Sequence, residues 1–169
     1  MQSIINKLNK LINATGYFSA LLMMLMLINI FYDVLMRYLF NNGNIGMQEM
    51  EWHLFSAMFM LGLGYTMKED GHVRIDVFYD HFSQPKKAIV NIFGALVFTL
   101  PFSLMIIYFG TQYTYDAFLL NEGSGDPGGL PNRWIIRSVI PISFGFLILC
   151  LVQVILVNSL TLLVKREAK

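Results

Sequence analysis

The chain has 169 residues, of which 56% are hydrophobic and 14% are charged, and its formal net charge is +1. This length allows one domain, and we expect residues 1–169 to form it. The small net charge argues against a nucleic-acid partner, and the single cysteine, Cys150, excludes a disulfide within the chain. Because the apolar residues form long blocks and the mean hydropathy is +0.56, the composition favours an all-α integral membrane protein over a soluble domain.

The first 36 residues predict two consecutive helices. Residues 1–15 carry apolar side chains at helical spacing among polar ones, which predicts a short amphipathic helix at the membrane surface. Residues 16–36 are almost entirely apolar, and the length of the uncharged run, with no cleavage site after it, favours an uncleaved membrane span over a signal peptide. Gly16 and Ala20 form a small-xxx-small pair, which would let another helix approach closely.

A pair of opposite charges lies near the end of this first span. Asp33 and Arg37 are four residues apart, so their side chains share one face of a helix. We expect a local ion pair, or snorkelling of the arginine to the interface, and keep a subunit contact as the alternative.

The second span is predicted at residues 49–67, after a turn-rich connection at residues 41–48. Glu49 and Glu51 open the span, and in the first turn of a helix they would be stabilised by the macrodipole. His53 follows Glu49 by four residues, which favours a local pair, with a contact to a partner subunit as the alternative. A dense polar segment follows the span and is expected to lie outside the membrane.

The second half of the chain predicts two more spans. An amphipathic interfacial helix is expected within residues 68–87, before a third span at residues 88–109 that Pro101 should kink. The segment after this span is too rich in Gly and Pro for regular structure. The fourth span is predicted at residues 135–163, where Pro141 indicates either a kink or a late start of the helix.

Basic residues outside the spans predict the orientation. Nine of them lie at the two termini and in the polar segment after the second span, and three lie at the other ends of the spans. This asymmetry places both termini in the cytoplasm, with Trp52 and Trp134 at the outer interface. The nine are Lys7, Lys10, Lys68, Arg74, Lys86, Lys87, Lys165, Arg166 and Lys169, and the three are Arg37, Arg133 and Arg137.

A set of short motifs in the first half resembles one known family. The motifs are Arg37-Tyr38-Leu39-Phe40, Glu49, Leu61-Gly62 and His72-Val73-Arg74-Ile75-Asp76, in that order. They resemble the small membrane subunit, the DctQ-type or Q subunit, of tripartite ATP-independent periplasmic (TRAP) transporters. The chain departs from the family's pattern at Gly46 and Gln48, where members often have Trp and a second acid. Its segment GDPGGLPNRW also belongs to a longer loop than in many members.

The resemblance implies a part in secondary transport and no enzymatic activity. Such a subunit pairs with a large membrane subunit that carries the substrate and sodium sites. A periplasmic binding protein delivers the substrate, usually a carboxylate. The small subunit would brace the fixed scaffold of the large one in the bacterial inner membrane. No cofactor is expected in this chain, because sodium coupling is expected in the partner.

Six charged or titratable residues form the candidate site for positioning the helices or contacting the partner. The hypothesis is that they fix the depth and register of the first two helices, because hydrophobic burial does not drive helices together in lipid. They are Asp33, Arg37 and Glu49 at the outer ends and His72, Arg74 and Asp76 at the inner end.

Catalytic and metal chemistry find little support in the sequence. No nucleotide-binding loop, H-E-x-x-H or G-x-S-x-G motif occurs. His72, Asp76 and Asp80 would align on a helix and could ligate a metal, but a solvated or interfacial polar face is the favoured interpretation.

Two other functional classes stay open on the sequence. A haem-binding anchor subunit of an electron-transfer complex needs axial ligands inside the helix bundle. His53 is the only histidine in a predicted span, although eleven Met residues keep a His/Met pair available. A small homo-oligomeric exporter is the third class. A haem absorbance band would favour the anchor, and transport by this chain alone in liposomes would favour the exporter.

Overall fold

The structure is a computed structural model that describes residues 2–69, 71, 79 and 81–167. All regular secondary structure in this part of the chain is helical, which confirms the predicted all-α class. The elements are α1 (Gln2–Phe40), α2 (Ile45–Lys68), α4 (Gln84–Gly94), the π-helical η1 (Ala95–Thr99), α5 (Leu100–Leu119) and α6 (Trp134–Glu167).

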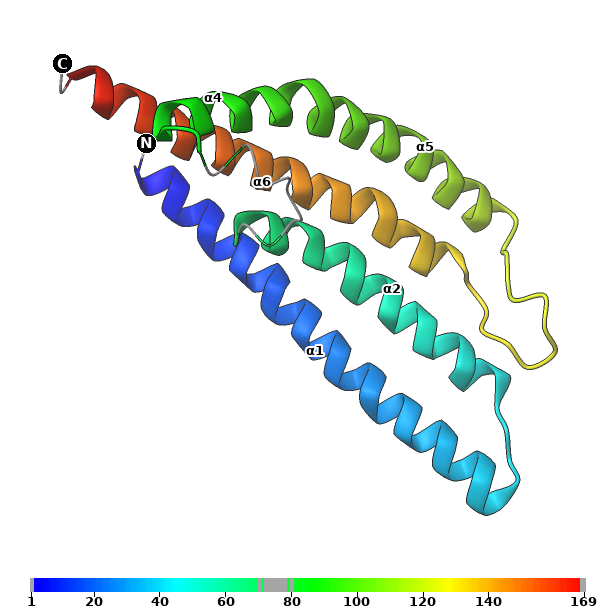
Figure 1. The fold of residues 1–169 in the computed structure, drawn as a ribbon. Helices are drawn as coiled ribbons and strands as arrows, with labels where there is room; N and C mark the ends of the chain where they lie inside the picture. Colours follow the sequence, from blue (N-terminus) through cyan, green and yellow to red (C-terminus); the bar gives the residue numbers. More distant parts are fainter. Residues whose placement is uncertain (1, 70, 72–78, 80, 168–169) are drawn as a thin grey trace.

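The long helices lie beside one another in the view of Figure 1, an arrangement called the layer below. α1 packs against α2, α2 packs against α6, and α4, η1 and α5 also pack against α6. α1 contacts α6 directly as well, and the Gln153 amide of α6 donates to the Asn9 side chain of α1 at 3.2 Å. The amino-terminal end of α1 and the carboxyl-terminal end of α6 lie at the same end of the layer. The connections at residues 41–44 and 120–133 lie at the opposite end, called the loop end below.

The first helix is longer than a membrane span. α1 has 39 residues, or about 58 Å at 1.5 Å per residue, whereas the hydrocarbon core is about 30 Å thick. The predicted separate amphipathic helix at residues 1–15 is therefore wrong, because those residues extend the same helix. Its buried side chains recur at intervals of three, four and seven residues and form one narrow seam of coiled-coil type. They are Ile5, Ile12, Ser19, Leu22, Asn29 and Asp33.

The second helix begins four residues earlier than predicted. Asn44 is its N-cap, and its side chain accepts a hydrogen bond from the backbone N–H of Met47 at 3.3 Å. The first turn of α2 therefore contains no acidic residue, and the macrodipole argument for Glu49 and Glu51 is wrong. The carboxylate of Glu49 has other partners, which are described below.

The helix that contains the predicted third span, formed by α4, η1 and α5, also runs beyond the predicted end at residue 109. It continues to Leu119, and within it the backbone N–H of Leu100 bonds to the carbonyl of Ala95 in a π-helical turn. This wider turn accommodates Pro101, which has no N–H to donate. The polar residues near the end of α5 continue the helix, and the Thr114 hydroxyl donates to the Gly110 carbonyl at 2.8 Å. α6 begins at Trp134 with Pro141 inside it, so a late start is excluded.

A glycine faces a neighbouring helix in each of three helix contacts. A Cβ added to Gly16 would come within 2.5 Å of the Tyr65 ring of α2, whereas Ala20, the other member of the predicted small-xxx-small pair, is exposed. The Cβ positions of Gly64 and Gly110 lie 3.6 Å from the Phe146 carbonyl oxygen and 3.3 Å from Pro141 of α6. Small residues thus bring the helix backbones together, as they do in membrane bundles.

Three stretches of helix are long and apolar enough to cross a membrane: Gln2–Phe40, Gln84–Leu119 and Trp134–Leu163. They contain the predicted first, third and fourth spans. α2 is not among them. Most of residues 70–80 lie outside the described part of the chain. The predicted interfacial helix within residues 68–87 falls partly there, and the predicted residues His72, Arg74 and Asp76 fall there entirely.

Candidate functional site: the polar network at the loop end

The densest set of polar contacts lies at the loop end of the layer. It joins α1, α2, α5, α6 and the connection at residues 120–133. We call it the loop-end network, and its members are Asp33, Arg37, Gln48, Glu49, Glu122, Ser124, Leu130, Arg133 and Arg137.

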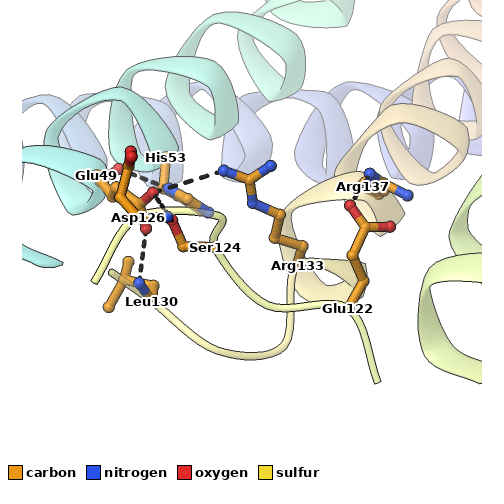
Figure 2. Close-up of polar contacts among 8 residues, drawn as sticks. All are labelled: Glu49, His53, Glu122, Ser124, Asp126, Leu130, Arg133 and Arg137. Atoms are coloured by element: carbon orange, nitrogen blue, oxygen red, sulfur yellow. Dashed lines mark hydrogen bonds and ion pairs between the residues drawn. The ribbon is translucent and has the colours of Figure 1, made fainter. Parts of the chain in front are cut away.

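Glu49 is the centre of this network (Figure 2). Its side chain points from the second turn of α2 into the connection between α5 and α6, and the residue is only 4% exposed. The Ser124 hydroxyl donates to one carboxylate oxygen, and the backbone N–H of Leu130 donates to the other at 2.6 Å. The Arg133 guanidinium approaches the carboxylate at 3.5 Å. One carboxylate therefore holds a loop that lies 75 or more residues away in the sequence.

The loop backbone is shaped to surround this carboxylate. Ser124 donates its N–H to the Leu130 carbonyl at 2.9 Å, which closes the loop on itself. A Cβ added to Gly129 would lie 2.4 Å from the Ser124 side chain and 2.9 Å from the Glu49 carboxylate, so no larger residue fits there without movement. Gly46 lies under the same loop, with its Cβ position 3.2 Å from the Gly128 carbonyl oxygen. The long loop and Gly46, both noted as departures from the family's pattern, therefore fit one another.

A second ion pair fixes the two ends of the same loop. Arg137 of α6 pairs with Glu122, and its guanidinium lies over the Tyr113 ring of α5 at 3.9 Å from the centroid. The backbone N–H of Arg133 donates to the Glu122 carbonyl at 2.8 Å. These contacts hold the ends of α5 and α6 together at the loop end.

The contact between α1 and α2 has its own polar group. Arg37 pairs with Asp33, as predicted, and Asp33 is 3% exposed. The Gln48 amide lies against the same guanidinium, and its oxygen accepts from Arg37 Nη1 at 3.2 Å in the orientation that satisfies both groups. The Asn29 amide donates to the Met47 carbonyl at 2.9 Å. Arg37 therefore bridges α1 and α2.

The predicted local pair of Glu49 and His53 forms through the backbone. His53 Nδ1 lies 2.5 Å from the Glu49 carbonyl oxygen, so this nitrogen carries the proton and donates it. The Glu49 side chain is directed to the loop instead.

Sequence reasoning found three of the described residues in this network and missed the others. Asp33, Arg37 and Glu49 were predicted, and each makes an ion pair, although no described contact joins Glu49 to the Asp33–Arg37 pair. Glu122, Ser124 and Leu130 were missed because they lie in a segment that reads as an irregular loop. Arg133 and Arg137 were used only to predict the orientation in the membrane. Their position beside that loop could have indicated that they pair with an acid.

The network has the properties of a structural clamp. Its acids are paired with arginines, and its contacts join helices rather than surround an open reactive group. Among the residues that the structure describes, no three His, Cys, Asp or Glu side chains are grouped to hold a metal ion.

Comparison with known proteins identifies the family of the chain. The family described as tripartite ATP-independent periplasmic transporters, DctQ component, has a sequence model that matches residues 10–161. No curated protein matches the chain. The match spans most of the chain and includes every residue of the loop-end network. The chain therefore belongs to the DctQ family of tripartite ATP-independent periplasmic transporter components.

Proposed function

We propose that this chain is the small membrane subunit of a TRAP transporter and braces the scaffold of the large membrane subunit. The observation that carries this proposal is the broad apolar surface that the helices leave uncovered. The transporter would use a sodium gradient to take up an organic acid, which a periplasmic binding protein would deliver. The sodium and substrate sites belong to the large subunit, and the chain itself needs no cofactor.

The exposed surface supports a partner of membrane character. Large apolar side chains stay exposed along all the long helices, including Phe31 at 69% and Phe98 at 67%. In the most apolar 18-residue stretch of each candidate span, only between 11% and 28% is buried inside the structure. Lipid covers such a surface, and so does a second membrane subunit, whose helices pack through shape and polar contacts. A layer tied together at its loop end offers a rigid surface for that packing.

We infer four membrane spans, with α2 as the second. α2 has 24 residues, or about 36 Å, which is enough to cross a hydrocarbon core of about 30 Å. It lies between α1 and α6, so its less apolar sequence is covered on two sides by other helices. With four spans in the inner membrane, the basic residues place both termini in the cytoplasm.

Cysteine labelling tests this topology. In a Cys150→Ala background, we expect cysteines at Gly43 and Ser83, which lie before and after α2, to react with a membrane-impermeant maleimide from opposite sides of the membrane. Both positions are exposed, and a Cβ at Gly43 meets nothing within 4 Å. Labelling of both from the periplasmic side, or of neither in intact cells and both after lysis, contradicts four spans.

Co-purification tests the function itself. A tagged chain should bring down a large subunit from mild detergent. Proteoliposomes holding both subunits, the binding protein and a sodium gradient should take up substrate. Neither membrane subunit alone should do so. Uptake by the large subunit alone at the full rate contradicts the bracing role, and uptake by the small chain alone supports an exporter instead.

A charge reversal in the His72–Asp76 motif separates bracing from substrate binding. We expect Arg74→Glu to lower the amount of co-purified large subunit and therefore total uptake. Substrate affinity in the remaining complex should change less than about twofold, because the substrate site lies in the partner. Uptake kinetics normalised to the complex measure this. Full assembly with a tenfold loss of affinity, about 1.4 kcal/mol, shows that the chain contributes to the substrate site.

A further inference from the structure

Two cavities follow one another along α6 between α2 and the α4–η1–α5 helix, and together they are called the groove below. The groove consists of a cavity of about 270 Å³ toward the loop end and a second cavity of about 460 Å³ toward the other end. The residues that line the two cavities recur every three or four positions on both helices, so each helix presents one continuous stripe. The stripe of α2 is Trp52, Ser56, Met60, Leu63 and Met67. The stripe of α6 is Ile136, Arg137, Ile140, Phe144 and Leu147, and Arg133, just before the helix, extends it.

Among the described lining residues, the charged side chains lie at one end of the groove, and the cavity at the other end has Asn91 and Thr99 as its polar side chains. The cavity at the loop end contains Arg133, Arg137 and His53 beside two aromatic rings, Trp52 and Tyr113. From Met60 onward the two stripes are apolar. Trp and Tyr side chains with a polar edge concentrate at the depth of lipid head groups. The arginines therefore lie at head-group depth, and the apolar part of the groove lies at the depth of the acyl chains.

The Arg133 guanidinium has donors to spare. In the part of the chain that the structure describes, its polar contact is the Glu49 carboxylate at 3.5 Å, and that carboxylate already accepts from Ser124 and Leu130. The Arg133 side chain is 29% exposed, so most of it is withdrawn from solvent. A guanidinium carries five N–H donors in a planar fork that matches phosphate. A phosphate at the mouth of the groove would satisfy them.

We propose that this groove binds one glycerophospholipid. Its phosphate is bound by Arg133, with Arg137 beside it. One acyl chain follows the stripes of α2 and α6 through the first cavity toward the second. The cavity at the loop end is slightly smaller than the about 300 Å³ at which pockets for whole small ligands begin, so it suits part of a long molecule. This lipid site is independent of the proposed bracing role.

A flexible chain fits this groove better than a helix of a partner. An α-helix is about 10 Å wide along its whole length, whereas the groove is divided into two separate cavities. An acyl chain bends at each bond and can pass a narrow stretch between them. A partner helix also brings no phosphate to Arg133.

Native mass spectrometry of the full chain, alone or with the partner that co-purifies, tests the proposal. We expect the wild type to keep one phospholipid after extensive washing in mild detergent. Ser56→Phe places a ring in the cavity at the loop end and should abolish that retention. Arg133→Gln leaves the apolar stripes intact and should lower it at least about fivefold through loss of a charge-assisted bond. Ile142→Phe, at a position of α6 that is 50% exposed and lines neither cavity, is the matched control and should keep the lipid.

Further measurements separate the possible outcomes. Retention of no lipid by the wild type, or equal retention by wild type, Ser56→Phe and Arg133→Gln, overturns the proposal. Glycerol 3-phosphate, which has the head group without chains, should not raise the thermal stability at millimolar concentration. A stabilisation by it that Arg133→Gln removes indicates a site for a small anion and contradicts the lipid. If Ser56→Phe fails to fold, Arg133→Gln alone decides. A crosslink from a cysteine at Ser56 to the large subunit in place of a retained lipid also overturns the proposal.

Discussion

Replacing Glu49 by alanine is expected to release the connection at residues 120–133 from α2. The carboxylate accepts from Ser124 and from the Leu130 N–H and approaches the Arg133 guanidinium, so its removal leaves all three without their partner. A polar group that loses its partner in a partly buried place carries the full cost of desolvation. The loop should therefore open far more often.

Hydrogen–deuterium exchange of the purified chain measures this opening directly. The amide of Leu130 should exchange at least about tenfold faster in Glu49→Ala, because its acceptor is gone. The amide of Ser124, which bonds to the Leu130 carbonyl at 2.9 Å, should follow. Glu49→Gln keeps an oxygen acceptor but loses the charge, so its exchange rates should lie between those of Glu49→Ala and the wild type.

Glu51→Ala is the matched control. It removes the same charge from the same helix two residues later, and no described ion pair or hydrogen bond involves the Glu51 side chain. Its loop exchange should equal that of the wild type. Unchanged exchange at Leu130 in Glu49→Ala, or an equal increase in Glu51→Ala, would show that the loop is held by something other than this carboxylate.

The membrane character and the helices could be predicted from the sequence because both depend on local composition. The spans at residues 16–36, 88–109 and 135–163 lie inside helices of the structure. The helix ends were less predictable. Residues 1–15 and residues 110–119 are polar enough to read as interface or loop, but a helix that leaves the membrane needs only helical propensity and a few tertiary contacts to continue.

The site was predictable in part for a related reason. Asp33 and Arg37 were found because they are four residues apart in the sequence, so helical geometry alone brings them together. Glu49 was found as an acid at the start of the second predicted span and through a resemblance, but its partners were not found. Ser124 is 75 residues away, and the loop that brings it to α2 depends on left-handed residues such as Asn121 and Asn132 and on the room left by Gly46 and Gly129. No periodicity in the sequence predicts such a long-range contact.

Replacing Gly64 by leucine is expected to separate α2 from α6. The Cβ position of Gly64 is 3.6 Å from the Phe146 carbonyl oxygen and 3.8 Å from the Cys150 Cβ, so a methyl group fits but the rest of a leucine does not. The nearest atom belongs to the backbone of α6 and cannot turn aside. The contact also includes the Cys150 thiol, which lies 3.0 Å from the Gly64 carbonyl oxygen. Packing of this kind is what holds helices together in lipid.

Unfolding of the purified chain in mild detergent, followed by tryptophan fluorescence, should grade these variants by size. Gly64→Ala should stay close to the wild type, because its added carbon makes ordinary van der Waals contacts. Gly64→Leu should lose roughly 2 kcal/mol of unfolding free energy, a typical cost of an overpacked contact. Gly145→Leu in the middle of α6 is the matched control, since nothing lies within 4 Å of its Cβ position, and it should unfold like the wild type. Equal stability of Gly64→Leu and Gly145→Leu would mean that α2 is not held against α6 by close backbone approach. The order of the helices in the layer would then need another cause.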